Sequence, residues 1–482
     1  MGELLKTSIR GISWTTLSSI VRNLVSLIQI IILTRILAKE DFGLVATATV
    51  FLGFTSIFLD MGISVGILHK QNITKNEYSS LYWLNIVTSI FLCGIVMSFA
   101  PLYSKLNNAS EELTHIIRLM SISIIFSGIS SQHRIVQQKE MRFKYLAIID
   151  IPVSIVTMIA AILLAKKGMG VYSLVFSSLA GSLLASIIYL FLGICKDKNI
   201  HLHFNLKETF PFLKIGVYQL GAAILDFFSR EIDIIFIGSS FGNDTLGLYS
   251  LCKKIVLTVY NTVNPIFMRV LTPLFAKLQG GKEQLRTIYL RLVVSLSVIN
   301  FPIYFLISIF SFGILTILYG EQYTEGAFVL SVLSLYYGVL TVSNPVGSLQ
   351  VALGRTDIGF YWTIYRISTT LLVVYIGSLS NINIMVILFF IMAIINTIVA
   401  WKVQIYRMIK ISFNNYIVTI SKPLIIAFLL ATPFYILFSE TYFLWKIILF
   451  SSLYLIIYII TVRYTMKNSF LINLLLNIYN RK

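Results

Sequence analysis

Charged residues are scarce in this chain, and acidic residues are the scarcest. Only 12% of its 482 residues are charged, with 20 acidic against 38 basic side chains and a formal net charge of +18. No soluble domain of this length has such a balance, whereas apolar runs of about 20 residues are typical of transmembrane helices. Because the basic residues lie mostly in short loops, their excess indicates membrane topology and not nucleic-acid binding.

Motifs for the common catalytic and energy-coupling chemistries are also missing. The sequence has no GxxxxGK[ST] loop, which excludes ATP binding of that kind. Its three cysteines, Cys93, Cys195 and Cys252, are far apart and match no metal or redox spacing. Neither a clustered set of metal ligands nor a Ser–His–Asp set can be assembled. We therefore expect no cofactor, and we expect any energy coupling to use an ion gradient, the membrane potential or a substrate gradient.

Apolar runs separated by loop residues predict an all-α polytopic membrane protein with fourteen spans. These lie near 12–36, 43–67, 80–103, 113–137, 145–165, 169–194, 210–238, 246–274, 287–317, 326–351, 358–379, 383–407, 416–438 and 443–464. Twenty-one loop Lys and Arg residues lie on one side and five on the other, which predicts that both termini are cytoplasmic. The loops are too short for a soluble catalytic domain, so we expect no enzyme.

Two short segments echo each other at an offset of 204 residues. Residues 38–45 follow the first span, and residues 242–249 follow the seventh. A chain so rich in Leu can produce such an echo by chance, but the shared place in the span order favours a duplicated six-helix lobe. The predicted division is an N-lobe at 1–200, a C-lobe at 201–412, and an accessory pair of spans with a tail at 413–482. The segment Lys196–Lys207 is the predicted linker between the lobes. Parallel repeats of this kind place the substrate between the lobes and work by rocking.

Several charged side chains fall in the middle of spans, where a charge costs roughly 3 kcal/mol on insertion scales. Such a charge normally faces a bundle interior or a watery cavity, and arginine binds phosphate through paired hydrogen bonds. The basic residues predicted to bind an anionic substrate are Arg22, Arg230, Lys253, Lys254 and Arg366. The acidic residues predicted to couple to an ion or to act in gating are Asp60, Asp226, Glu231 and Asp233.

These charges also have structural explanations. Asp226, Arg230 and Asp233 are spaced along one helix face, so they can neutralise one another. Arg22 can pair with Asp60 from the neighbouring span. The basic residues slightly outnumber the acidic ones, and such an excess focuses a positive potential in a cleft with low-dielectric walls. The net positive charge of these mid-span residues therefore predicts a cationic cavity that binds an anion.

Four segments resemble the Wzx-type polysaccharide, O-antigen and teichuronic-acid flippases of the multidrug/oligosaccharidyl-lipid/polysaccharide (MOP) exporter superfamily. They are Gly11–Thr16, Thr34–Gly43, Asp60–Ile63 and Gln137–Lys144. The resemblance covers most of residues 1–410 and is strongest to the colanic-acid and teichuronic-acid exporter branch. It implies two MATE-like six-helix lobes with two accessory C-terminal helices.

The resemblance further implies a flippase of the bacterial cytoplasmic (inner) membrane, which serves the synthesis of lipopolysaccharide, O-antigen or capsule. Its substrate would be an undecaprenyl-pyrophosphate-linked oligosaccharide that crosses from the inner to the outer leaflet by alternating access through a cationic lumen. Membrane lipids and the polysaccharide polymerase machinery would be further partners. Arg22 and Arg230, in the first helix of each lobe, would be functional cations.

Three other functions stay open from the residues alone. A flippase for the peptidoglycan lipid precursor would bind the same pyrophosphate anchor. A MATE-type multidrug or cation antiporter favours an acidic, aromatic pocket, whereas the mid-span charge here is basic. A membrane polysaccharide polymerase or ligase would need a sizeable outer loop, and none is predicted.

Overall fold

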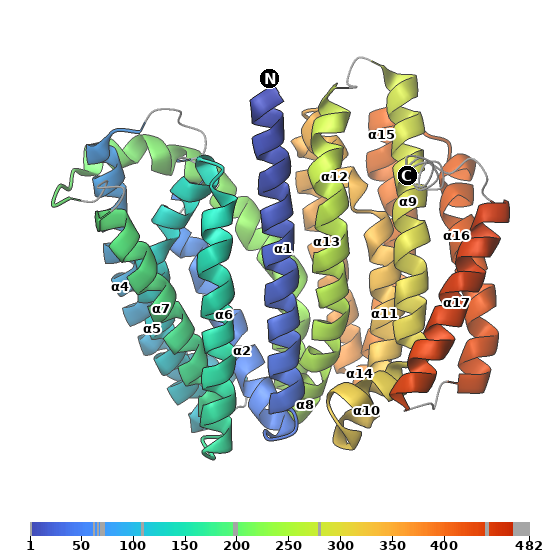
Figure 1. The fold of residues 1–482 in the computed structure, drawn as a ribbon, viewed down its shortest axis with the longest axis horizontal. Helices are drawn as coiled ribbons and strands as arrows, with labels where there is room; N and C mark the ends of the chain where they lie inside the picture. The colour runs from blue at the N-terminus through green and yellow to red at the C-terminus, as the bar shows by residue number, and fades with distance from the viewer. Residues whose placement is uncertain are drawn as a thin grey trace. The chain divides into compact units, whose positions relative to one another are not determined.

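The computed structural model describes residues 2–60, 63–64, 67, 73–107, 110–195, 201–277, 281–438 and 443–465. Every regular element in these ranges is a helix (Figure 1). Contacts divide the chain into two compact units, Met1–Gly247 and Leu248–Lys482, and each is described by itself. Residues 61–62 of one resembling segment, residues 196–200 of the predicted linker between the lobes, and residues 466–482 of the predicted tail lie outside the described ranges. The three-part division at 200 and 412 stays a prediction.

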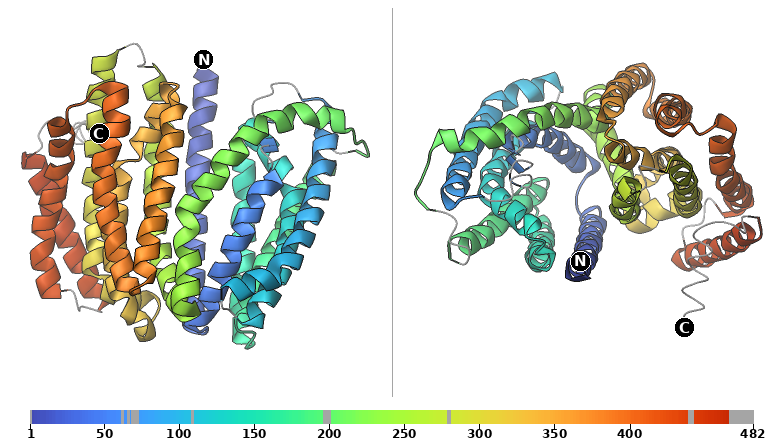
Figure 2. Two further views of the ribbon diagram at one scale, coloured as in Figure 1. Left: turned by 180° about the vertical axis from the view of Figure 1, so that it is seen from behind. Right: turned by 90° about the horizontal axis from the view of Figure 1, so that it is seen from above.

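The first unit is a bundle of helices that run side by side, seen end on in Figure 2. Its helices are α1 (Gly2–Leu33), α2 (Lys39–Asp60), α4 (Lys75–Leu106), α5 (Glu111–Lys139), α6 (Phe143–Lys166), α7 (Tyr172–Cys195) and α8 (Leu206–Lys277) as far as Gly247. Helix α5 packs on α2, α4 and α7, and α6 packs on α1 and α7. Fully buried aliphatic side chains, among them Leu44, Leu113 and Val175, form the core where α2, α5 and α7 meet.

Local sequence fixes two of the helix boundaries. Thr74 precedes α4, its hydroxyl accepts from the backbone N–H of Glu77, and the Glu77 carboxylate accepts from the backbone N–H of Thr74. This capping box satisfies backbone donors that a helix start leaves unpaired. Within α8, Gly242 has φ 81°, a left-handed conformation that costs glycine little, and the helix axis breaks there.

The second unit begins with the remainder of α8. It continues with α9 (Lys282–Ile309), α10 (Ser311–Leu318), the 3₁₀ helix η1 (Glu321–Gly326), α11 (Ala327–Val342), α12 (Pro345–Ala352), α13 (Thr356–Ser378), α14 (Ile382–Ala400), the π-helical turn η2 (Trp401–Ile405), α15 (Tyr406–Ile409), α16 (Phe413–Phe438) and α17 (Leu444–Thr465). Helix α9 packs on α11 and α16, and α11 also packs on α14. The core contains fully buried tyrosines, among them Tyr289, Tyr416 and Tyr454.

Eleven helical segments in the described ranges are long and apolar enough to cross a membrane. The count of fourteen is therefore not confirmed. The other three predicted spans are helical: 210–238 and 246–274 fall in α8 on either side of Gly242, and 358–379 falls in α13. These three segments carry Arg230, Lys253, Lys254 and Arg366, which are most of the predicted cavity cations.

The two segments that echo each other in sequence touch each other within the first unit. A Cβ atom on Gly43 would lie 2.0 Å from the carbonyl oxygen of Asn243, and one on Gly247 would lie 1.9 Å from the carbonyl oxygen of Lys39. The same offset of 204 residues relates Gly43 to Gly247 and Lys39 to Asn243. The two contacts are thus reciprocal, as where two copies of one helical turn, here in α2 and α8, meet across a local two-fold axis. Only glycine leaves room for the opposing backbone.

Candidate functional site

Four helices of the first unit bring three charged side chains and a tyrosine to one point. Arg134 of α5 donates from Nη2 to Oδ2 of Asp150 in α6 at 2.6 Å. Nη1 of Arg22 in α1 lies 3.6 Å from the same oxygen. Tyr189 of α7 donates its hydroxyl to Oδ1 of Asp150 at 3.2 Å. Two guanidinium groups and a phenol therefore surround a single carboxylate, and this group is called the arginine cluster below.

The carboxylate of the arginine cluster is hidden, and the guanidinium groups are partly exposed. The side chain of Asp150 is 11% exposed, against 40% for Arg22 and 39% for Arg134. A hidden carboxylate is stable only when cations and hydrogen-bond donors compensate its desolvation. Because one carboxylate faces two guanidinium groups, the cluster keeps an excess of one positive charge.

The prediction that Arg22 pairs with Asp60 is wrong. Oδ1 of Asp60 accepts from the backbone N–H of Ser64 at 3.2 Å and from the Ser64 hydroxyl, so it is bonded within its own stretch of chain. Asp150 is the acidic partner of Arg22, and the candidate residues did not include it. Its position inside an otherwise apolar span was a signal, because an intramembrane carboxylate is a functional candidate by itself.

Of the three charges on α8 that were predicted to neutralise one another, Arg230 and Asp226 form an ion pair. Nη2 of Arg230 and Oδ2 of Asp226 are 2.8 Å apart, as the i, i+4 spacing predicts. The two side chains are 65% and 47% exposed, so in water the pair would contribute little stability. Asp233 is buried, and its Oδ1 accepts from the backbone N–H of Ile234 at 2.9 Å. Glu231 is half-buried. Roles in substrate binding, ion coupling or gating stay predictions for these four residues.

The remaining predicted cations belong to the second unit. Lys253 of α8 is 5% exposed, whereas the adjacent Lys254 is exposed. Arg366 of α13 is half-buried. Their part in a cationic cavity stays a prediction. This unit has a pocket of about 860 Å³ lined by hydroxyl and aromatic side chains together with Glu321, including Ser311, Phe312, Thr316 and Tyr435.

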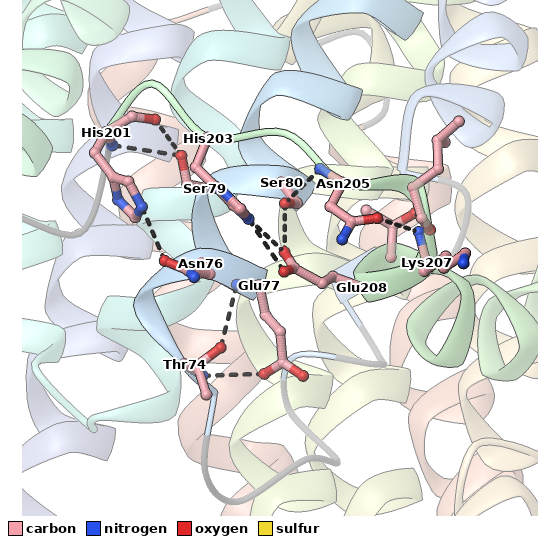
Figure 3. A network of polar contacts seen from close by, with 12 residues as sticks. Thr74, Asn76, Glu77, Ser79, Ser80, His201, His203, Asn205, Lys207 and Glu208 are labelled. Carbon is pink, nitrogen blue, oxygen red and sulfur yellow. Dashed lines mark hydrogen bonds and ion pairs between the residues drawn. The ribbon is translucent and has the colours of Figure 1, made fainter.

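The segment before α8 is tied to the start of α4 (Figure 3). The hydroxyl of Ser79 and Nε1 of Trp83 both donate to the carbonyl oxygen of His201, the latter at 3.0 Å. The backbone N–H of Asn205 donates to the Ser80 hydroxyl at 3.0 Å. These bonds fix the described part of the predicted linker, residues 201–207, to the first turns of α4.

Glu208 completes this tie. The Ser80 hydroxyl donates to its Oε2 at 2.6 Å, and Nε2 of His203 lies 3.1 Å from its Oε1. The rings of His201 and His203 stack with centroids 5.7 Å apart. Among the residues that the structure describes, no group of three His, Cys, Asp or Glu side chains is arranged to hold a metal ion, so we interpret this cluster as a structural tie.

Replacing Ser80 by alanine is expected to loosen the tie. The hydrogen bonds from Ser80 and His203 lower the pKa of Glu208, and a lowered carboxyl pKa stabilises the folded state above the usual value near 4.3. That contribution is lost as the pH falls through the lowered pKa, and Ser80→Ala moves the loss to higher pH. We expect amide hydrogen exchange of residues 201–208 to be at least about fivefold faster in the variant at pH 7, because Ser80→Ala removes both the bond to Glu208 and the bond from the N–H of Asn205.

A matched control lies on the same helix. The hydroxyl of Ser98 donates to the Gly94 carbonyl within α4, at 2.8 Å, so Ser98→Ala should leave exchange at 201–208 unchanged. Equal exchange in the Ser80 and Ser98 variants would show that the tie does not hold this segment.

The family pattern of polysaccharide biosynthesis proteins matches residues 32–327, more than half of the chain. The chain belongs to this family. It is 26% identical over 422 residues to the lipopolysaccharide biosynthesis protein WzxC of Escherichia coli K12, covering 87% of this chain and 85% of that protein. It is 27% identical over 435 residues to the teichuronic acid biosynthesis protein TuaB of Bacillus subtilis 168, covering 88% of each. The resemblance to polysaccharide flippases is confirmed.

Solved structures establish the fold. The lipid II flippase MurJ in its inward closed conformation aligns with a TM-score of 0.76 at 15% identity, over 95% of this chain and 100% of that one. An inward-facing multidrug transporter of the MATE family aligns with a TM-score of 0.61 at 14% identity, over 78% and 92%. At these identities the likeness concerns the fold alone. The expected all-α, MATE-like fold of a multi-pass membrane protein is confirmed.

Proposed function

We propose that this protein is a flippase that moves an undecaprenyl-pyrophosphate-linked oligosaccharide from the inner to the outer leaflet of the bacterial cytoplasmic membrane. Family membership supports a role in making a surface polysaccharide, and relatives such as WzxC and TuaB carry that role in their names. The observation that carries the proposal is the arginine cluster. Its excess positive charge inside an apolar bundle suits a lipid-linked anion, because guanidinium groups bind phosphate oxygens in pairs.

The proposed orientation has both termini in the cytoplasm, as the distribution of loop Lys and Arg favours. In this orientation the substrate arrives from the inner leaflet, and membrane lipids and the polysaccharide polymerase machinery are its neighbours. We propose no enzymatic step and no cofactor. The energy source would be an ion gradient, the membrane potential or the substrate gradient.

Two rival functions differ from the proposal in substrate charge or chemistry. A multidrug or cation antiporter would need an acidic site, and in the arginine cluster cations outnumber the carboxylate. A flippase for the peptidoglycan precursor would share both the fold of MurJ and a pyrophosphate-linked lipid. The two flippase functions therefore differ in the glycan that is accepted.

A reconstituted system tests the function directly. The purified protein in lipid vesicles should move a fluorescent undecaprenyl-pyrophosphate-linked oligosaccharide to the opposite leaflet, measured as fluorescence that becomes accessible to an external quencher. Transport of lipid II in preference to such oligosaccharides would identify the peptidoglycan rival. Accumulation of cationic dyes without lipid movement would support the antiporter. Growth of glycan chains would support a membrane polysaccharide polymerase or ligase.

A further inference from the structure

The arginine cluster leaves most of its hydrogen-bond donors without a carboxylate to bind. Oδ2 of Asp150 is shared between two guanidinium groups, and its Oδ1 accepts from Tyr189. Arg22 lies 3.6 Å from Oδ2, beyond the range of a good hydrogen bond, so Asp150 attracts it only through charge. Each guanidinium has five N–H donors in a planar fork. Asp150 therefore holds two forks close together while occupying only one of their donors, on Nη2 of Arg134.

The cluster lies between the middle of the spans and one of their ends. Nζ of Lys144 lies 5.7 Å from the ring centroid of Trp14, close to where the apolar parts of α6 and α1 begin. A helix rises about 1.5 Å per residue, so Arg22 lies about 12 Å beyond Trp14 and Asp150 about 9 Å beyond Lys144. With a hydrocarbon core about 30 Å thick, the cluster lies about a third of the way across the membrane from the side of the N-terminus.

Basic side chains continue from the cluster to that same end. Arg134 lies one to two turns before the end of α5, and Lys144 lies at the start of α6 beside Arg142, which pairs with Glu140 at 3.0 Å. A succession of cations from the membrane surface inward attracts anions and raises their local concentration. In the proposed orientation this end faces the cytoplasm, where a lipid-linked substrate is made.

We propose that Arg134 and Arg22 form a capture site for a lipid-borne pyrophosphate, and that Asp150 is a built-in counter-charge that keeps the binding weak enough for release. The inference rests on the proposed flippase function and deepens it by naming Arg134, Asp150 and Tyr189, none of which the sequence singled out for substrate binding. Nη2 of Arg134 is hydrogen-bonded to Oδ2 of Asp150 at 2.6 Å. Nη1 of Arg22 lies 3.6 Å from the same oxygen, so Arg22 turns more readily toward a ligand.

The sign of the Asp150 effect follows from electrostatics. In the empty site, the carboxylate stabilises two guanidinium groups that would otherwise repel each other. Once a pyrophosphate is bound, the same carboxylate is a like charge beside it and favours its departure. Tyr189 holds the carboxylate in place through Oδ1. Asp150 is thus a positioning residue that limits affinity, since a transport site must bind its cargo tightly enough to load and weakly enough to unload.

Binding of inorganic pyrophosphate and of farnesyl pyrophosphate to the purified full-length protein in detergent tests the site. Arg134→Gln and Arg22→Gln should each weaken binding at least tenfold, because each removes charge-assisted hydrogen bonds. Asp150→Asn should tighten binding at least tenfold and yet slow lipid flipping in vesicles. Asp150→Glu, which keeps the charge, should restore affinity and flipping toward those of the unsubstituted protein. A residue with only a structural role would not tighten binding when replaced.

Arg118→Gln is the matched control. Arg118 lies toward the other end of α5, and its Nε donates to the Met97 carbonyl at 3.4 Å, so its replacement should leave pyrophosphate affinity unchanged. Unchanged affinity in both Arg134→Gln and Arg22→Gln would overturn the capture site. Weaker or equal binding in a folded Asp150→Asn protein would overturn the counter-charge role.

Binding of phosphatidylglycerol to the same variants shows whether the site takes a lipid headgroup phosphate or a pyrophosphate. If the arginine variants change phosphatidylglycerol binding and not pyrophosphate binding, the site belongs to a structural lipid and the proposal fails. These binding results are independent of the flipping assay. Absence of flipping by the unsubstituted protein would overturn the proposed function, whereas the variant series would still decide whether the pyrophosphate site exists.

Discussion

Substituting Gly247 by alanine is expected to destabilise the first unit by about 3 kcal/mol, the upper part of the range for overpacking a tight contact. The added Cβ would lie 1.9 Å from the carbonyl oxygen of Lys39 and 3.1 Å from the backbone nitrogen of Gly43. Both neighbours are backbone atoms at the start of α2, so neither can turn away as a flexible side chain would. In a helix without such contacts, replacing glycine by alanine stabilises by up to about 1 kcal/mol, so the expected sign is opposite to the ordinary one.

Thermal unfolding of the purified protein in detergent measures this effect, with a fall in Tm of about 2–4 °C per kcal/mol for a unit of this size. Gly94→Ala is the control, because Gly94 lies in α4 of the same unit and a Cβ atom there meets nothing within 4 Å. It should leave Tm unchanged or raise it. A Gly247→Ala protein as stable as Gly94→Ala would show that the two turns are not in close contact.

The reciprocal contact supplies a second test. Gly43→Ala should cost a similar amount, because its Cβ atom would lie 2.0 Å from the carbonyl oxygen of Asn243. The double substitution should cost less than the sum of the two, since either one alone already forces the turns apart. Full additivity would mean that the two glycines act at independent contacts.

Reversing the charge of Arg22 is expected to reduce surface polysaccharide by more than tenfold in cells that depend on this protein. Glutamate at position 22 would stand beside the carboxylate of Asp150, where arginine now lies 3.6 Å away. Two like charges in a poorly solvated place repel, and the arginine cluster would change from an excess of one positive charge to an excess of one negative charge. A site of that sign rejects a pyrophosphate.

Surface polysaccharide and the amount of protein in the membrane are measured together, so that lost transport is separated from lost folding. Arg22→Lys should give an intermediate result, because lysine keeps the charge but lacks the planar fork that binds phosphate oxygens in pairs. Lys105→Glu, at an exposed position at the end of α4, is the control for charge reversal and should export normally. Normal polysaccharide in the Arg22→Glu strain would exclude a role for this cation in transport.

The sequence by itself determined what depends on neighbouring residues along the chain. Apolar runs set the helices, because a segment in lipid must satisfy its backbone hydrogen bonds internally. The Asp226–Arg230 pair was predictable because helix geometry brings residues i and i+4 together. The echo between residues 38–45 and 242–249 was visible, although nothing in it showed that the two turns touch.

Only the tertiary structure decided which charges meet across helices. Asp150 could have faced Arg22, another span or lipid, and the packing of α6 against α1 and α7 turned it toward two arginines and a tyrosine. The same packing left Asp60 with Ser64 and not with Arg22. The physical reason is that hydrophobic burial sets how helices pack and is nearly indifferent to which apolar face is used, whereas an ion pair forms only where that packing places two atoms within a few ångströms.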